Sequence, residues 1–285
     1  MPPSTTISNP DSVNELLTDE KLPLKNRSLH LSLELREEQL LASLLDKQNN
    51  QYIAWASFPV KGKESTLEKV LEEPIFNSSA TVSIAFTLNS SLLVPALYFK
   101  KEAAIDYLKQ QQLDKANETP SYDYIKNLDS YNLYTVNAKV LATLRDKFPS
   151  ATVRHHASIF VEYLITENKN SQDDKVCVCV FNTYMDVVVL QGSKLILANR
   201  YYYENNSDFM YNLLWLYEQL KLNAEKTQCT FYGEIEKSSD IYSLSAKYIK
   251  KVKLGEKNEQ ASYSIPLNTL SPHKYRSLFT QFLCV

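Results

Sequence analysis

The chain has 285 residues, of which 44% are hydrophobic and 22% charged, and its formal net charge is -2. This composition is typical of a globular protein, and the length is sufficient for two compact domains. The weak negative charge gives no electrostatic reason to expect a nucleic-acid partner. Because the N-terminus lacks a signal-peptide pattern and no segment has about 18 consecutive apolar residues, we expect a cytoplasmic protein without membrane insertion.

The four cysteines lie in apolar segments and are too few for a disulfide framework in a chain of this length. Cys177 and Cys179 alternate along a predicted strand, so their thiols share one face. A metal or redox site would need further Cys or His ligands, and the sequence contains no CxxC or HxxxH spacing. We therefore expect that the cysteines are buried and structural, that the protein has no metal site, and that it is located in a reducing cytoplasm.

Residues 1–27 combine Pro, Ser, Thr and charged residues, which predicts an N-terminal leader with a short amphipathic segment near Val13–Leu17. From His30 to Leu35 polar and apolar residues alternate, and this period of two predicts a half-buried strand. The stretch 113–121 is polar and is predicted to be a loop. Further strands are predicted at 40–45, 52–60, 81–88, 131–136 and 153–155. Helices are predicted at 64–73, 101–112 and 138–148, and through Tyr163 and Leu164.

The segment 168–174 contains no apolar residue, and we place the boundary between two halves there. A hairpin turn is predicted at Gln191–Lys194, and Asn206 or Ser207 is the expected cap of a long helix. The predicted strands of this half are 176–181, 185–190, 195–203, 228–232 and 252–254. Its predicted helices are 209–220, 241–249 and 273–283. Three strands followed by a helix thus occur in the same order in both halves.

This repeated order resembles the actin-like ATPase superfamily, whose fold consists of two ribonuclease-H-like lobes and is similar in its smaller bacterial form to the pilus-assembly protein PilM. The second half also resembles an uncharacterised bacterial family of unknown function with this fold. The features that carry this resemblance are the hairpin with Asp186, the turn at 192–195, the helix at 209–220 and the stretch 232–235. The resemblance implies a duplicated α/β fold with mixed sheets flanked by helices, and we expect lobes at 28–170 and 171–285.

Catalytic members of the superfamily carry an acidic residue at the end of the first strand and glycines in the hairpin that follows. A Cβ there would keep backbone N–H groups away from phosphate oxygens. In the first half, the resemblance puts Glu34 at the acidic position, but Arg36 occupies the hairpin. Glu37 and Glu38 would add like-charge repulsion against a triphosphate.

In the second half, Asn182 lies in the hairpin between Phe181 and Thr183, which fall near the glycine positions. Asp186 matches a later acidic residue of the superfamily. The adenosine-side motif keeps a single glycine, Gly233, followed by Glu234. Only four glycines occur in the whole chain, so a rearranged glycine-rich phosphate loop elsewhere is not expected.

The leading hypothesis is therefore a non-catalytic actin-like protein that serves as a cytoplasmic scaffold or adaptor. PilM-like relatives bind short peptide segments of membrane partners, so the resemblance implies a protein or peptide partner. The alternative is a divergent ATPase or sugar-kinase-like phosphotransferase that uses ATP with magnesium. Self-association into dimers or filaments is a third expectation. The residues that would line a vestigial nucleotide cleft are Glu34, Arg36, Asn182, Asp186, Gly233 and Glu234.

Overall fold

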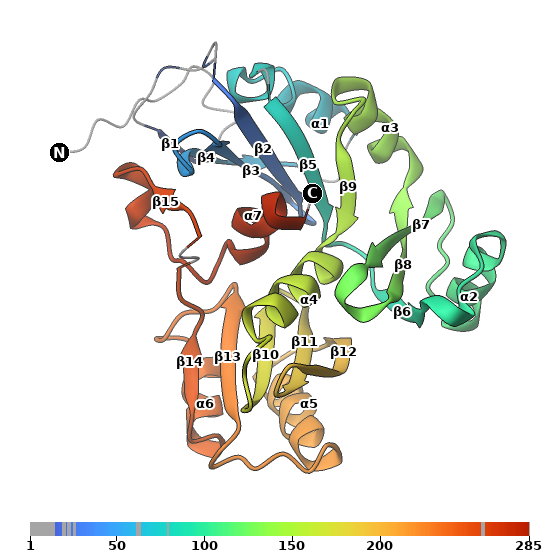
Figure 1. The fold of residues 1–285 in the computed structure, drawn as a ribbon, viewed down its shortest axis with the longest axis vertical. Coiled ribbons are helices and arrows are strands. Elements are labelled where there is room, and N and C mark those ends of the chain that lie inside the picture. The colour runs from blue at the N-terminus through green and yellow to red at the C-terminus, as the bar shows by residue number, and fades with distance from the viewer. Residues whose placement is uncertain are drawn as a thin grey trace. The chain divides into compact units, whose positions relative to one another are not determined.

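The computed structural model describes residues 15–18, 21, 24, 27–60, 64–78, 80–257 and 260–284. The chain divides into two compact units, each with its own sheet (Figure 1). The first unit comprises the described residues of Met1–Ile159, Asn258–Leu270 and Ser277–Val285. The second comprises Phe160–Lys257 and Ser271–Arg276.

The main sheet of the first unit has the strand order β1-β4-β3-β2-β5-β9. Strands β2, β3 and β4 form an antiparallel meander, and β5 and β9 continue the sheet parallel to β2. The short β15 (Ser262–Tyr263) pairs with β4. The bounds are β1 Glu15–Thr18, β2 Leu29–Leu35, β3 Gln39–Asp46, β4 Gln51–Pro59, β5 Ala80–Phe86 and β9 Thr152–His155.

The second unit repeats this arrangement in a five-stranded sheet of order β12-β11-β10-β13-β14. Its first three strands again form an antiparallel meander, and its last two again run parallel to the central strand. The predicted duplication is thus confirmed strand by strand. The bounds are β10 Asp174–Val180, β11 Tyr184–Gln191, β12 Lys194–Tyr202, β13 Gln228–Gly233 and β14 Val252–Leu254.

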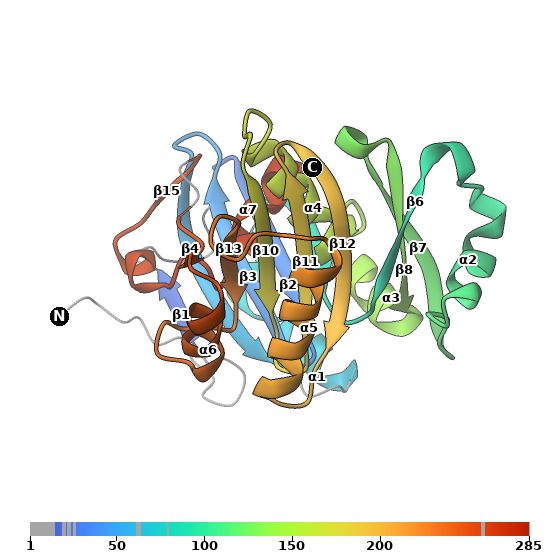
Figure 2. The ribbon, with the colours of Figure 1, turned by 90° about the horizontal axis from the view of Figure 1, so that it is seen from below.

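Two helices cover one face of each sheet. In the first unit α1 (Glu64–Val70) and α3 (Ala138–Lys147) bury Leu67, Val70 and Leu144 against the meander. In the second unit α5 (Asn206–Gln219) and α6 (Asp240–Tyr248) pack in the same way, with α5 lying along the sheet (Figure 2). Because these helices place apolar residues at 3.6-residue spacing, each sheet gains a hydrophobic core on that face.

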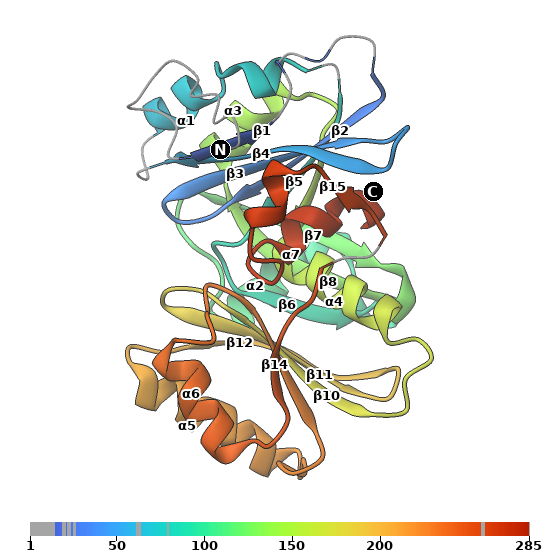
Figure 3. The ribbon, with the colours of Figure 1, turned by 90° about the vertical axis from the view of Figure 1, so that its left-hand side faces the viewer.

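The other face of β2 is polar and is covered by the C-terminal end of the chain. Here α7 (Arg276–Thr280) and the 3-10 helix η6 (Gln281–Cys284) lie on the side opposite α1 and α3 (Figure 3). Every residue of β2 is therefore buried. The strand itself was predicted correctly, but the prediction that only one of its faces is buried is wrong. The alternation of polar and apolar residues in β2 correctly separates a polar face from an apolar one. The polar face is nevertheless buried, because the C-terminal segment covers it.

Between β5 and α3 the first unit contains a separate three-stranded sheet, with the order β6-β8-β7, that has no counterpart in the described residues of the second unit (Figure 1). Helix α2 (Ala104–Gln110) packs on it through Leu108, beside Val94 and Leu133. The prediction of a loop at 113–121 is wrong for its last four residues, because Glu118–Ser121 belong to β7 and pair with β8. The bounds are β6 Ser91–Pro95, β7 Glu118–Ile125 and β8 Ser130–Asn137.

The ends of the predicted domains differ from the division that the structure shows. In the predicted leader, Glu15–Thr18 form the strand β1, which overlaps the predicted amphipathic segment, and most of the remaining leader residues lie outside the described ones. The first unit ends at Ile159, inside α4 (His156–Glu167), rather than at residue 170. The C-terminal residues from Ser277 also belong to the first unit, because they cover the polar face of β2.

Candidate functional site

The hairpins after β2 and after β10 correspond to each other in their backbone hydrogen bonds. Arg36 N–H donates to the Gln39 carbonyl over 2.8 Å, and Phe181 N–H donates to the Tyr184 carbonyl over 2.9 Å. The sheet register agrees, since Glu34 lies opposite Leu41 and Cys179 lies opposite Asp186. Arg36 and Phe181 therefore occupy the same place in the two units. Glu34 and Cys179 are likewise equivalent.

Glu34 lies at the end of β2 and forms a buried ion pair with Arg36. Its side chain is 0% exposed, and Arg36 Nε donates to Glu34 Oε1 over 2.7 Å. The hydroxyl of Ser277 donates to the other carboxylate oxygen, Oε2. Burial alone would raise the pKa of Glu34, but Arg36, His156 and the Ser277 hydrogen bond hold it below its usual value.

The C-terminal segment closes the surface around Glu34. Gln281 Nε2 donates to the Leu33 carbonyl over 2.9 Å, and Ser83 Oγ donates to Gln281 Oε1 over 2.8 Å. His30 contributes Nε2 to the same Ser83 hydroxyl at 2.9 Å. A magnesium ion needs carboxylate oxygens that are open to it and to its water ligands. Both oxygens of Glu34 are already occupied, so this position does not fit the metal of an ATPase.

Asp186, on β11, is held by a cation of the neighbouring strand. Arg200 Nε and Nη2 donate to the two carboxylate oxygens of Asp186 over 2.7 and 2.8 Å, and the guanidinium lies 3.7 Å from the centre of the Tyr184 ring. Burial opposes the charge of Arg200, but Asp186 outweighs it and raises the arginine pKa. This bidentate pair engages both carboxylate oxygens of Asp186, so a nucleotide metal would have to compete with Arg200 for them.

Gly233 is required by the packing of β13 against β10. Its φ is +81°, and a Cβ would lie 2.2 Å from the Val180 carbonyl oxygen. Glu234 N–H donates to that same carbonyl over 2.7 Å, while its side chain is exposed. The retained glycine therefore permits a close contact between two strands, which is a structural reason for a glycine here.

Asn182 lies in the exposed turn between β10 and β11, at the edge of a hollow of about 780 Å³. The hollow is formed by this turn, the end of β12 and the first turns of α5. Among the described residues that line it, two are acidic and none is basic. The lining residues are Asn182, Thr183, Tyr202, Tyr203, Glu204, Asp208, Tyr211 and Asn212.

Two of the six candidate residues, Glu34 and Arg36, are in direct contact. Asn182, Gly233 and Glu234 lie at the carboxyl ends of the paired strands β10 and β13. Asp186 lies on β11 beside Arg200, which the sequence reasoning missed. A bulge between Val189 and Leu190 shifts the register of β11 and β12 by one residue. In a regular hairpin that starts from the pair Gln191–Lys194, Asn199 would lie opposite Asp186 instead of Arg200.

The match to a family of protein sequences covers most of the chain. The model of the family described as "Protein of unknown function (DUF3822)" matches residues 19–252. The chain belongs to this family. No curated protein matches the chain in sequence.

Solved structures establish the fold. A Bacteroides thetaiotaomicron protein with an actin-like ATPase fold and unknown function aligns with a TM-score of 0.77 at 18% identity, covering 92% of this chain and 98% of that one. A PilM-PilN type IV pilus biogenesis complex aligns with a TM-score of 0.54 at 11% identity, covering 90% and 99%. The chain has an actin-like ATPase fold, as the sequence resemblance implied.

Three further observations concern the described residues alone. No group of three or more His, Cys, Asp or Glu side chains among them is arranged to hold a metal ion. None of the helices in this part of the chain has the length and apolar character needed to cross a bilayer. Cys177, Cys179 and Cys229 are buried and take part in no disulfide, and burial raises the pKa of the Cys177 thiol to about 12.

Proposed function

We propose that this protein is a non-catalytic member of the actin-like fold that acts as a cytoplasmic scaffold or adaptor and binds a segment of a protein partner. The observation that carries the proposal is the state of Glu34. A catalytic carboxylate at the end of the first strand would have to face magnesium and water, whereas Glu34 is enclosed by Arg36 and Ser277.

The second unit supports the same proposal. Phosphate groups are held by backbone N–H groups, lysine or arginine side chains and metal ions. The hollow beside the second hairpin instead contains Glu204 and Asp208, and Phe181 and Thr183 replace the expected glycines. The two carboxylates would repel a triphosphate and attract a cation.

The chemistry of this hollow favours a partner segment that carries lysine or arginine. Tyr202 and Tyr211 are 60% and 68% exposed, and tyrosine is among the residues that dominate binding energies in protein interfaces. Their rings can lie against a cationic side chain whose charge is paired with Glu204 or Asp208. PilM, which shares the fold, was solved in a complex with PilN, and this supports a protein partner by analogy.

The alternative, a divergent ATPase or sugar-kinase-like phosphotransferase, would use Glu34, Asp186 and Gly233. It would require both carboxylates to leave their arginine partners, and Gly233 to serve a ligand in addition to its contact with Val180. Each requirement carries a cost in free energy, so the ion pairs favour the non-catalytic proposal.

A binding titration tests the partner proposal. We expect a lysine-rich peptide to bind the full chain saturably, and a glutamate-rich peptide of equal length not to bind. Replacing the exposed tyrosine of the hollow, Tyr211→Ala, should weaken binding about fivefold or more, which corresponds to about 1 kcal/mol.

The matched control is Tyr248→Ala, because Tyr248 lies on α6, is 59% exposed and does not line the hollow. Equal loss of binding in both variants, or equal binding of the acidic and basic peptides, would contradict the proposed site. Fluorescence anisotropy with labelled peptides at moderate ionic strength provides the measurement.

A further inference from the structure

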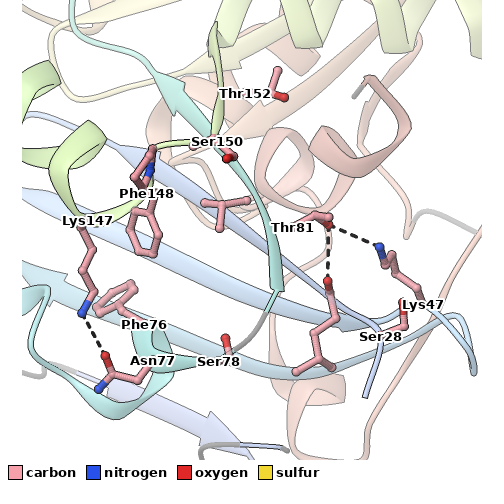
Figure 4. A pocket seen from close by; sticks show the side chains of 14 residues that line it. Ser28, Lys47, Phe76, Asn77, Ser78, Thr81, Lys147, Phe148, Ser150 and Thr152 are labelled. Atoms are coloured by element: carbon pink, nitrogen blue, oxygen red, sulfur yellow. Dashed lines mark hydrogen bonds between the residues drawn. The ribbon is translucent and has the colours of Figure 1, made fainter. Parts of the chain in front are cut away.

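The first unit contains a second hollow, of about 750 Å³, at the opposite end of β2 from Glu34 (Figure 4). Its walls are formed by the amino ends of β2, β5 and β9, the turn after β3, the 3-10 helix η1 (Pro74–Asn77) and the end of α3. Glu34 follows Leu29 by five positions along β2, or about 16 Å at strand spacing. In open α/β sheets ligands bind at the carboxyl ends of the strands, so this hollow is separate from the vestigial nucleotide position.

The hollow has a positive character. Lys47 and Lys147 contribute ammonium groups from the β3–β4 turn and from the end of α3, and no described lining residue carries a carboxylate. Lys147 Nζ donates to Asn77 Oδ1 over 2.9 Å, and Lys47 Nζ lies 3.4 Å from the Thr81 hydroxyl. Neutral acceptors orient the two ammonium groups without cancelling their charge. The hollow therefore favours an anion.

Hydroxyl groups and two aromatic rings complete the lining. Phe76 and Phe148 are buried, with ring centroids 6.4 Å apart at 63°. An anion here could receive hydrogen bonds while an apolar part of the same molecule lay against the rings. The hydroxyl-bearing lining residues are Ser28, Ser78, Thr81, Ser150 and Thr152.

We propose that this hollow binds a small organic anion that carries a phosphate or carboxylate group on an apolar, ring-sized body. The volume lies within the range of about 300–1,000 Å³ that is usual for small-molecule sites. Lys147 binds the anionic group at the end of the hollow where Phe76 and Phe148 contact the body, and Lys47 lies at the other end (Figure 4). The site is independent of the peptide-binding hollow of the second unit.

Calorimetric titration of the full chain with phenyl phosphate, benzoate and inorganic phosphate tests the proposal. We expect saturable binding of phenyl phosphate or benzoate, and at least tenfold weaker binding of inorganic phosphate, which lacks the apolar body. The ratio of the first two affinities identifies the preferred anionic group. Equal binding of inorganic phosphate and phenyl phosphate would overturn the role of the rings.

Paired variants localise the site. Lys147→Gln removes one of the two charges and should weaken binding about tenfold. Lys69→Gln removes an exposed lysine of α1 that does not line the hollow, and should leave the affinity unchanged. Absence of binding by both aromatic anions, or equal affinity of the two variants, would overturn the proposal. Thermal unfolding of each variant without ligand verifies that the fold is intact.

Discussion

Glu34 and Arg36 form the residue pair on which the functional interpretation depends. Truncation of one member of a buried ion pair leaves an uncompensated charge, whereas replacement of both by apolar residues is often close to neutral. We predict that Arg36→Ala lowers the free energy of unfolding by about 3–5 kcal/mol. Urea unfolding at pH 7 measures this value.

The double variant Glu34→Leu/Arg36→Met provides the control for that prediction. It removes both charges and should recover most of the stability that the single variant loses. If Arg36→Ala were as stable as the unmodified protein, Glu34 would have another cation or solvent available to it. That result would contradict the enclosure of Glu34 by Arg36 and Ser277.

His30 gives the first unit a defined dependence on pH. Burial and, to a lesser extent, Lys47 lower its pKa from 6.5 to about 4, while its ring nitrogens bond to Thr81 and Ser83. The unfolded chain then binds the additional proton first, so stability is complete above pH 6.5 and falls as the pH decreases toward 4. The decrease is on the order of 3 kcal/mol.

His30→Gln isolates this contribution, because glutamine keeps a donor and an acceptor but does not titrate. We predict a smaller loss of unfolding free energy between pH 6.5 and pH 4 in His30→Gln than in the unmodified chain, measured by urea unfolding at several pH values. Parallel curves for the two proteins would contradict the lowered pKa of His30.

At the scale of elements, the N-cap residue of α5 differs from the predicted one. The sequence favoured Asn206 or Ser207, whereas the side chain of Asn205 accepts hydrogen bonds from Ser207 N–H and Asp208 N–H over 2.9 and 3.0 Å. Asn205→Ala should lower the free energy of unfolding by about 1 kcal/mol, and Ser207→Ala should have little effect. Reversal of these two effects in chemical unfolding would contradict the observed cap.

The sequence predicted most strands and helices because their hydrophobic periodicity is clear. It failed where partners come from distant parts of the chain. Strand β7 alternates weakly and is defined by its pairing with β8, while the burial of the polar face of β2 depends on Ser277 and Gln281, more than 240 residues away. The pairing of Asp186 with Arg200 depends on a local feature, the bulge that shifts the register between β11 and β12.

At the scale of the whole molecule, the two units keep the same strand order and directions. The duplication was predictable because it repeats a pattern along the chain, and the comparisons confirm the actin-like fold. The predicted boundary at residue 170 and the observed end of the first unit at Ile159 differ because α4 continues from one unit into the other. Because the division lies inside this helix, no change of composition marks it in the sequence.

Above all, we propose that this chain keeps the actin-like fold without the means to hold a nucleotide. Calorimetric titration of the full chain with ATP, with and without magnesium, is the decisive experiment. We predict no saturable binding that requires magnesium up to millimolar ATP, because Glu34 and Asp186 are paired with arginines and the second hairpin lies beside two carboxylates. Saturable micromolar binding that requires magnesium and is lost in Asp186→Ala would contradict this proposal.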